Sequence, residues 1–219
     1  MWLADTPSAA RAEATPGARG SCPSCRDVVI AKCGEIVARH WAHESREECD
    51  AWSEPDSVWH RAWQLEFPRA WCEVAVGPHR ADVKRPDGLV IEFQHSHIST
   101  EEIRERERFY GRMIWVFDAI SAKLTERLSI RLPRHCVSGC APCWEPWHRV
   151  VDVAKAETGY RTFRWKHPRT SLAACGRMVF LDVGGQVLSL RKFAVGPPCG
   201  GWGFARDPTF FVDRLRTPL

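Results

Sequence analysis

Apolar residues recur at helical and then at strand spacing between residues 57 and 118. The stretch 57–71, SVWHRAWQLEFPRAW, has the apolar spacing of a helix, with a proline near its end. Three short β-type runs follow, CEVAV, RADVK and LVIEFQH, which are separated by Gly-Pro at 77–78 and by Pro-Asp-Gly at 86–88. Residues 99–112 begin with N-capping and acidic residues that predict a second helix, and the apolar run MIWVFD at 113–118 predicts a buried strand. The predicted order is therefore helix, three strands, helix, strand.

The rest of the chain divides by composition. Residues 1–20 are rich in Ala, Gly, Pro and Arg, which predicts a disordered leader. A Cys/His-rich element at 21–56 precedes a core at 57–132. Residues 133–219 form a Cys/Trp-rich extension with a small β region, a strand pair around VFLDVGGQVLSLRKF, and a Gly- and Trp-rich tail.

Composition and charge narrow the class of protein. An apolar fraction of 44% and a charged fraction of 26% are typical of a globular protein. No apolar run approaches the roughly 20 residues that cross a bilayer, and the start of the chain lacks a secretory pattern, so a cytoplasmic protein without membrane contact is expected. The net charge of +4 permits nucleic-acid binding. In a reducing compartment the ten cysteines favour metal binding over disulfides.

Two carboxylates and an amide project from neighbouring predicted strands. Because side chains alternate across a strand, Glu92 and Gln94 share the face opposite an apolar one. If the preceding strand pairs through the turn at 86–88, Asp82 converges with Glu92. Two carboxylates with water can hold Mg²⁺ or Mn²⁺, which polarises a scissile phosphate and generates hydroxide at neutral pH. The alternative is that both are solvated positions on a half-exposed sheet.

Neighbouring polar residues have candidate roles in the same chemistry. Gln94 could hold the attacking water, although an amide cannot act as a base. Lys84, which shares the Asp82 face with Arg80, could supply positive charge. His60 on the first helix and Glu73 on the first strand are candidates for a third ligand or a proton shuttle.

The Cys/His-rich element has the spacing of a zinc site. Zn²⁺ takes four N or S ligands in a tetrahedron, and a CxxC pair can supply two of them through a tight turn. The preferred ligands are Cys22, Cys25, His43 and Cys49. His40 could replace Cys49, Cys33 is a weaker option, and reduced, packed cysteines are the alternative. With all four positions filled by protein, the role of the zinc would be structural.

Several short motifs recur in an order that resembles a known family. The series CPSC, HWAH, SVWHRAW, Glu73, HRADV, IEFQHSHIS and MIWVF resembles the competence protein CoiA-like family over roughly residues 20 to 120. Members of that family are predicted to be PD-(D/E)xK nucleases with an N-terminal Cys/His element. The resemblance implies an α/β, restriction-endonuclease-like core in which Asp82 and Glu92 bind metal and Gln94 occupies the lysine position.

The resemblance also implies roles outside the two metal ligands. His60 and Glu73 would complete the site, and Arg106 and Tyr110 would face the substrate backbone, or else be a surface arginine and a packed tyrosine. Where the family often has a lysine four residues after the histidine, this chain has Gln64.

A second cysteine cluster, Cys136, Cys140 and Cys143, has C-x3-C-x2-C spacing. With His148, His135 or a later cysteine it could hold a second zinc ion or an iron–sulfur cluster, or the cysteines could simply be packed. A radical enzyme would also use this spacing, but no barrel-like alternation of strands and helices surrounds it.

A basic stretch at 163–171, FRWKHPRTS, interleaves charged and aromatic residues. Arg164, Lys166 and Arg169 suit phosphates and the rings suit bases, or the stretch is a solvated loop. The sequence thus predicts an Mg²⁺- or Mn²⁺-dependent deoxyribonuclease linked to DNA uptake, recombination or defence. DNA is the expected partner, and recombination or defence proteins are candidate partners. The alternative is a catalytically weak or inactive DNA-binding accessory protein with the same fold.

Overall fold

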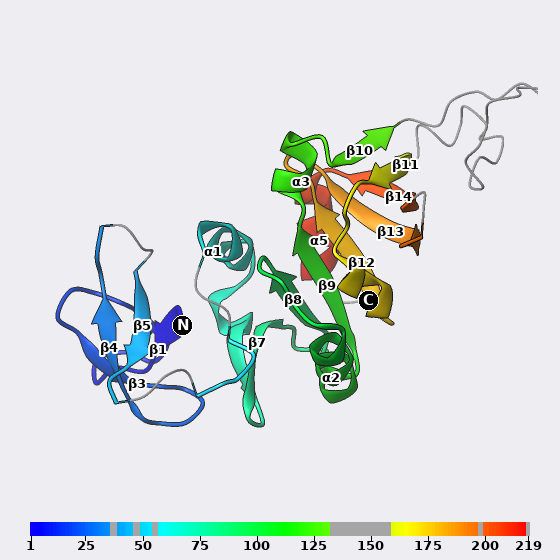
Figure 1. Ribbon diagram of the computed structural model, residues 1–219. Helices are drawn as coiled ribbons and strands as arrows, with labels where there is room; N and C mark the ends of the chain where they lie inside the picture. The colour runs from blue at the N-terminus through cyan, green and yellow to red at the C-terminus, as the bar shows by residue number, and fades with distance from the viewer. Residues whose placement is uncertain (36–38, 46–48, 54–56, 132–158, 197–198, 218–219) are drawn as a thin grey trace, which may run out of the picture. The chain divides into compact units, whose positions relative to one another are not determined.

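A computed structural model describes residues 1–35, 39–45, 49–53, 57–131, 159–196 and 199–217. The chain forms two compact units, Met1–Ser96 and His97–Leu219. Each unit combines helices with β-strands (Figure 1), and the chain as a whole has a mixed α/β fold. Among the helices of the described ranges, none has both the length and the apolar character needed to cross a membrane.

The first unit begins with small antiparallel sheets. Strand β1 (Leu3–Ala4) pairs with β2 (Ala12–Glu13), and β4 (Val28–Lys32) pairs with both β3 (Arg19–Ser21) and β5 (His40–His43). Their core is apolar and includes fully buried Trp41. Residues 1–20, expected to be a disordered leader, therefore fold. Leu3 and Ala4 are fully buried, and burying such side chains offsets the entropy of ordering the chain.

The second part of this unit carries the predicted helix and three strands. Helix α1 spans Val58–Leu65 and is followed, after Pro68, by the 3-10 turn η1 (Arg69–Trp71). Strands β6 (Cys72–Val76), β7 (His79–Lys84) and β8 (Val90–Gln94) pair antiparallel in that order. Both predicted turns join paired strands, so this series is confirmed. Helix α1 contacts β8, and the ring of Phe93 packs among the aromatic side chains of the helix.

The second unit contains six strands in the order β10-β11-β14-β13-β12-β9. These are β9 (Met113–Asp118), β10 (Leu128–Arg131), β11 (Tyr160–Trp165), β12 (Met178–Asp182), β13 (Val187–Ala194) and β14 (Gly200–Arg206). Strands β9 and β12 run parallel, and the other pairs are antiparallel. The sheet is therefore mixed.

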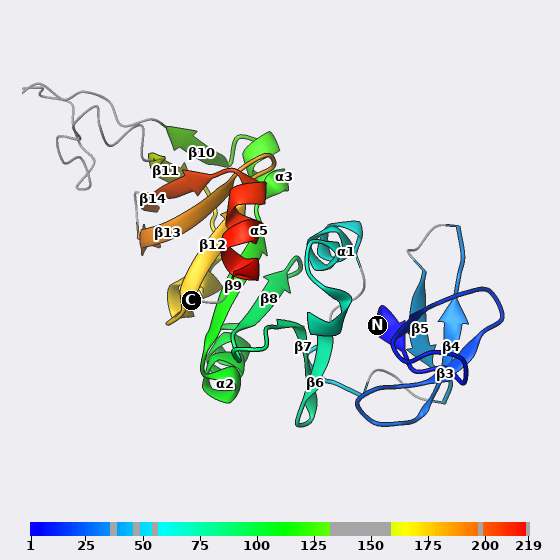
Figure 2. The ribbon, with the colours of Figure 1, turned by 180° about the vertical axis from the view of Figure 1, so that it is seen from behind.

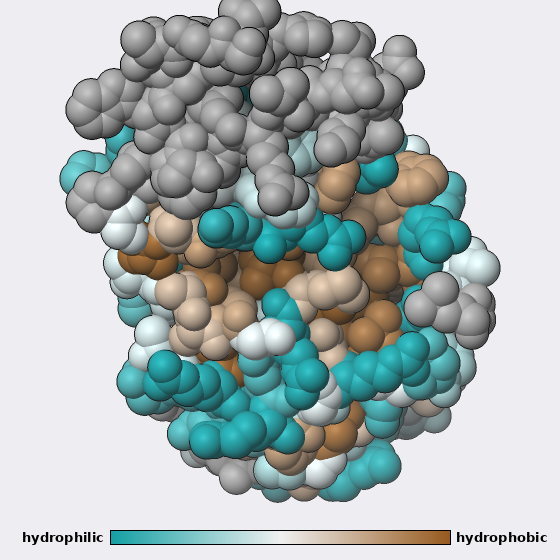
Figure 3. Space-filling view, turned by 90° about the vertical axis from the view of Figure 1, so that its right-hand side faces the viewer, coloured by the Kyte–Doolittle hydropathy of each residue, from teal (hydrophilic) through white to brown (hydrophobic). Residues whose placement is uncertain are grey.

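Helices and short turns complete this unit. Helix α2 (Thr100–Tyr110) begins at the N-cap Ser99, as predicted, and ends at Gly111. The others are α3 (Ile120–Leu124), the 3-10 turn η2 (Thr170–Ala174) and α5 (Pro208–Arg216). Helix α5 lies over the sheet (Figure 2), with the ring of Phe211 4.7 Å from that of Phe180. Some apolar side chains stay exposed, and Figure 3 shows apolar patches bordered by hydrophilic side chains.

The strand pair predicted around VFLDVGGQVLSLRKF is confirmed as β12 and β13. Gly184 and Gly185 connect them at positive φ angles of 76° and 71°, the conformation that a two-residue hairpin turn requires. The predicted boundary between 132 and 133 separates β10 from β11, although these strands pair. Strands β11 to β14 are therefore part of the main sheet of the second unit rather than an extension to a finished core.

Strand β14 lies between β11 and β13 and is built on closely spaced glycines. A Cβ atom at Gly201 would collide with the carbonyl oxygen of Lys192, and one at Gly203 with that of Ser189. The neighbouring backbones thus approach β14 more closely than a side chain allows. The sequence predicted only a Gly- and Trp-rich tail here.

Candidate functional site

Three carboxylates occupy one row across β6, β7 and β8. Continued by one residue, the β7–β8 register places Asp82 opposite Glu92, and Glu73 lies between Cys72 and Val74, which pair with Val83 and Ala81 on either side of Asp82. Strands β7 and β8 pair at Val83–Ile91 and Lys84–Val90, next to the turn, and Asp82 and Glu92 are the next residues beyond these pairs. The convergence of Asp82 with Glu92 that the alternation predicted thus agrees with the observed register.

The two central carboxylates each accept a hydrogen bond from the opposite backbone. Asp82 Oδ2 accepts from the Phe93 N–H at 2.8 Å, and Glu92 Oε1 accepts from the Asp82 N–H at 3.2 Å. At this point carboxylate oxygens, rather than backbone carbonyl oxygens, accept the backbone N–H groups of the neighbouring strand. Glu92 is 2% exposed, so it is not a solvated surface position. Two adjacent carboxylates, one buried and one half-buried, repel each other, and a divalent cation with oxygen ligands would relieve that repulsion.

His60 reaches this pair from helix α1. Its Nε2 lies 3.0 Å from Asp82 Oδ1, and its ring packs edge-on to that of Phe93. The position of His60 depends on the start of the helix, because the Ser57 hydroxyl accepts a hydrogen bond from the His60 N–H at 3.0 Å. The structure therefore places His60 and Glu92 each in contact with Asp82.

Two buried amides lie close to these residues in the fold. Gln64, one helical turn after His60, is 1% exposed, and in the part of the chain that the structure describes neither of its amide atoms has a hydrogen-bond partner. Leaving a buried amide unpaired costs about 1–3 kcal/mol. Gln94 is equally buried, and its Nε2 donates to Ser96 O at 3.4 Å. The unpaired Gln64 amide is the type of group that a water or a phosphate would satisfy.

Glu73 is engaged by the start of the chain. Its carboxylate accepts the Trp2 N–H at 2.7 and 2.9 Å and the Leu3 N–H at 2.7 Å, and Arg80 Nε lies 3.8 Å from it. Glu73 has a φ of 48°, in the left-handed region that non-glycine residues rarely adopt. Sequence reasoning missed the contact with residues 2 and 3 because it treated the leader as disordered.

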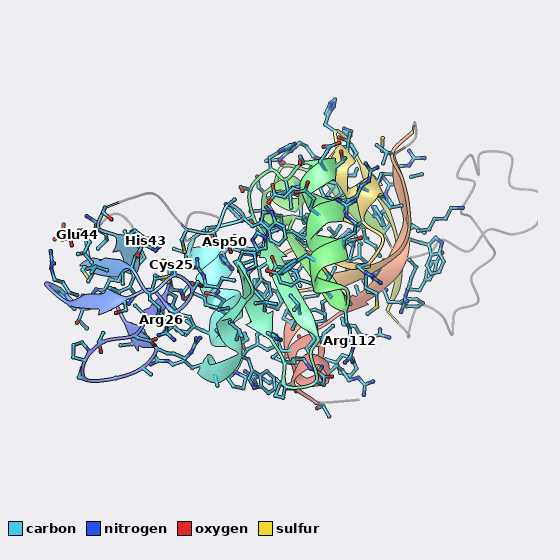
Figure 4. The ribbon with its side chains drawn as sticks, turned by 90° about the horizontal axis from the view of Figure 1, so that it is seen from below. Cys25, Arg26, His43, Glu44, Asp50 and Arg112 are labelled. Carbon is cyan, nitrogen blue, oxygen red and sulfur yellow. The ribbon has the colours of Figure 1, made fainter. Side chains whose placement is uncertain are left out.

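A second site lies in the small β element that precedes α1. The possible ligand atoms of Cys22, Cys25, His43 and Cys49, the four predicted zinc ligands, all lie within 4.8 Å of one another. This is the one such group of three or more ligands among the described residues. Cys25 Sγ is 3.3 Å from His43 Nε2 (Figure 4), and Cys22 Sγ is 3.7 Å from Cys49 Sγ.

These distances fit a tetrahedral zinc site. Two sulfurs about 2.3 Å from one zinc ion at a tetrahedral angle would lie about 3.8 Å apart. The CxxC turn is closed by Arg26 at a φ of 67°, with the Arg26 N–H donating to Cys22 O at 2.9 Å. Burial, together with the neighbouring Cys22 and Cys25 thiols, raises the pKa of Cys49 to about 12. The cluster could bind zinc, which would displace such protons.

The cluster is joined to the β6–β7 hairpin by the next residue. Asp50 is buried, and its carboxylate lies 2.8 Å from His79 Nδ1 and accepts the Arg80 N–H at 2.7 Å. Trp52 stacks on the His79 ring with centroids 3.2 Å apart. These contacts connect the possible zinc ligands to the strand that carries Asp82, and the sequence offered no signal for them beyond proximity to Cys49.

The predicted nucleic-acid-binding residues have different environments. Arg106 is buried and bonds to Glu102, whereas the ring of Tyr110 packs against Phe109. Arg169 donates to Asp118 O at 3.3 Å.

The other predicted cations differ in exposure, and the Arg80 side chain is only 8% exposed. Arg80 donates to Ser53 Oγ at 3.1 Å, Lys84 is half-buried, and Arg164 and Lys166 are exposed. Cys136, Cys140 and Cys143, with His135 and His148, lie outside the described residues.

Fold and site together define a mixed α/β protein with a four-residue Cys/His cluster that could bind zinc. Residues 14–51 match the family model described as the N-terminal domain of the competence protein CoiA, and the match contains all four residues of the cluster. Over this segment the chain is similar to that domain, and the predicted resemblance is confirmed there. The match ends before α1 and the carboxylate row. No curated protein and no solved structure matches the chain.

Proposed function

We propose that the protein is a metal-dependent nuclease that hydrolyses phosphodiester bonds in DNA. The observation that carries the proposal is the meeting of Asp82, Glu92 and His60 where the β7–β8 ladder ends. A competence-related family is consistent with DNA as substrate, and DNA uptake, recombination or defence would each supply it.

Each residue of the proposed site has a role that follows from its chemistry. Asp82 and Glu92 offer oxygen ligands to Mg²⁺ or Mn²⁺, which when bound polarises a phosphate and lowers the pKa of a coordinated water. His60, held by Asp82, is positioned to take or return a proton through Nε2. The buried amides of Gln64 and Gln94 orient water or a phosphate oxygen by hydrogen bonding.

The Cys/His cluster is proposed to hold a structural zinc ion. Four protein ligands fill a tetrahedral site and leave no position for a reacting water. Through Asp50 the zinc would stabilise the β6–β7 hairpin and hence the position of Asp82.

DNA cleavage by matched variants tests the proposal. Single-stranded and linear double-stranded DNA are incubated with Mg²⁺ or Mn²⁺ and with wild type, Asp82→Asn or Glu92→Gln. Both substitutions keep side-chain size and remove a charged ligand, so we expect cleavage to fall by at least about a hundredfold, the scale of losing one catalytic group. Glu35→Gln, at an exposed carboxylate of the same unit, should cleave as wild type does.

A second candidate function is a DNA-binding accessory protein without cleavage. It is favoured by the amides Gln64 and Gln94 at positions where a lysine would add the positive charge that phosphate chemistry uses. Clean wild-type protein that binds DNA but cleaves neither substrate with either metal would replace the nuclease proposal with this one. Unchanged cleavage in Asp82→Asn would place the chemistry elsewhere.

A further inference from the structure

A basic groove lies in the second unit, built wholly from residues after His97. It has a volume of about 770 Å³ and is lined by α3, the start of β10, the end of β11 and the residues next to them. Five of its lining side chains carry permanent positive charge, and one, Glu126, carries negative charge: the cations are Lys123, Arg127, Arg131, Arg164 and Lys166. His167 also lines the groove.

Backbone pairing brings the two sources of charge together. Strands β10 and β11 pair antiparallel with Ser129 opposite Arg164 and Arg131 opposite Thr162. Side chains two residues apart share a face, so Arg131 and Arg164 lie diagonally on the same face of this pair. The Lys166 N–H donates to Arg127 O at 2.7 Å, and this backbone hydrogen bond holds Lys166 and Arg127 next to each other. Residues more than thirty positions apart thus form one positive surface.

The five cations are exposed, and the opposite face of the β10–β11 pair is apolar. Leu128 and Trp165 are buried, at 1% and 3% exposure, and Ile130 is half-buried. Like charges this close repel one another, and a polyanion with regularly spaced phosphates relieves that repulsion while releasing its own counterions.

We propose that this groove binds single-stranded DNA, with its cations on successive phosphates. A concave site of this volume is within the range of about 300–1,000 Å³ that ligand pockets span, so it takes a flexible strand or a frayed end rather than the side of a duplex. The inference rests on the proposed function because DNA is taken as the polyanion. It assigns to the second unit a substrate-binding role separate from the carboxylate row.

Binding measured without cleavage tests the groove independently of the nuclease activity. Fluorescence anisotropy of a labelled oligothymidylate, in buffer free of divalent metal, is recorded for wild type and for Arg131→Gln/Arg164→Gln. We expect the double variant to bind on the order of tenfold more weakly and its salt slope to fall by about 0.7 for each lost phosphate contact. Arg131→Lys/Arg164→Lys should restore most of the affinity because the charge is kept.

The control removes the same charge elsewhere in the same unit. Arg104→Gln/Arg108→Gln, at exposed positions of helix α2, should bind as wild type does. Equal weakening in both double variants would overturn the proposal, because net charge alone would then explain binding. Unchanged affinity of Arg131→Gln/Arg164→Gln for the oligothymidylate would also overturn the proposal. So would a double variant that loses binding to a labelled duplex but keeps its binding to the single strand. Circular dichroism verifies that each variant is folded.

Discussion

Glu73 carries an unfavourable backbone conformation and an unusual set of hydrogen-bond donors at the same time. A left-handed conformation costs a non-glycine residue about 1–2 kcal/mol, and it is retained here where the side chain can accept backbone N–H groups from Trp2 and Leu3. Charged acceptors make strong hydrogen bonds of this type. The carboxylate therefore has a structural task, whatever part it takes in chemistry.

Glu73→Gln should lower the free energy of unfolding. The backbone N–H groups donate to both oxygens of the Glu73 carboxylate. A glutamine amide offers only one oxygen, and its NH₂ group would face a backbone N–H donor, so at least one hydrogen bond is lost. We expect a loss of about 1.5–3 kcal/mol, measured by urea denaturation. Cleavage per folded molecule should stay near that of wild type. A variant of normal stability that fails to cleave DNA would instead place Glu73 in the catalytic site.

At the level of single residues the sequence predicted the central pair and not its surroundings. Alternation and the turn at 86–88 were sufficient to predict that Asp82 and Glu92 lie close together. The burial of Gln64 and the contacts of Asp50 depend on the packing of α1 and on the segment after Cys49, which no local pattern specifies. Glu73 was recognised as a candidate, but its partners came from a segment expected to be disordered.

Among the elements, helix α1 matters most to the site because it delivers both His60 and Gln64. It is short, spanning Val58–Leu65, and isolated helices of this length are not stable in water. Its order therefore depends on the packing of Trp63 and its neighbours around Phe93 and on the Ser57 cap.

Ser57→Ala should destabilise the protein by about 1 kcal/mol, because the first turn of α1 loses the acceptor for the His60 N–H. Chemical denaturation measures the change, and Ser57→Thr should retain most of the stability. We also expect a lower cleavage rate in the alanine variant, because His60 sits in that first turn. If Ser57→Ala were as stable as wild type, the Ser57 cap would contribute nothing to stability.

Elements with regular periodicity were predicted well, and those stabilised by distant partners were not. The span of β9, the N-cap of α2 and the β12–β13 hairpin follow from local patterns. In contrast, β1 and β2 are two residues long each and exist through the core around Trp41. The pairing of β9 with β12 joins segments about sixty residues apart, which a pass along the chain cannot detect.

At the scale of the whole molecule, the Cys/His cluster is the connection on which the first unit depends. Its ligands come from the CxxC turn before β4, from β5 and from the segment before α1, so one ion would fix three parts of the chain. The next residue, Asp50, extends this connection to β7. A bound metal stabilises a fold by as much as it prefers the folded to the unfolded chain.

Removing zinc should therefore loosen the first unit. We expect the cluster in purified protein to hold one zinc ion, and chelation to lower the melting temperature and to expose the first unit to limited proteolysis. Elemental analysis should find little zinc in Cys25→Ser, whereas Cys33→Ser, outside the cluster, should retain it. Equal zinc in the two variants would show that the ion is bound elsewhere.

The glycines of β14 also bear on how distant relatives are recognised. Apolar alternation identifies most strands, but β14 sits inside its sheet because backbone atoms of β11 and β13 occupy the space of its missing side chains. Substitution at Gly201 or Gly203 would force adjacent strands apart, so selection should tolerate change there less than at most apolar core positions. In a diverged homologue, the G-G-x-G spacing of residues 200–203 would then be retained after the hydrophobic pattern has changed, and it would identify this unit.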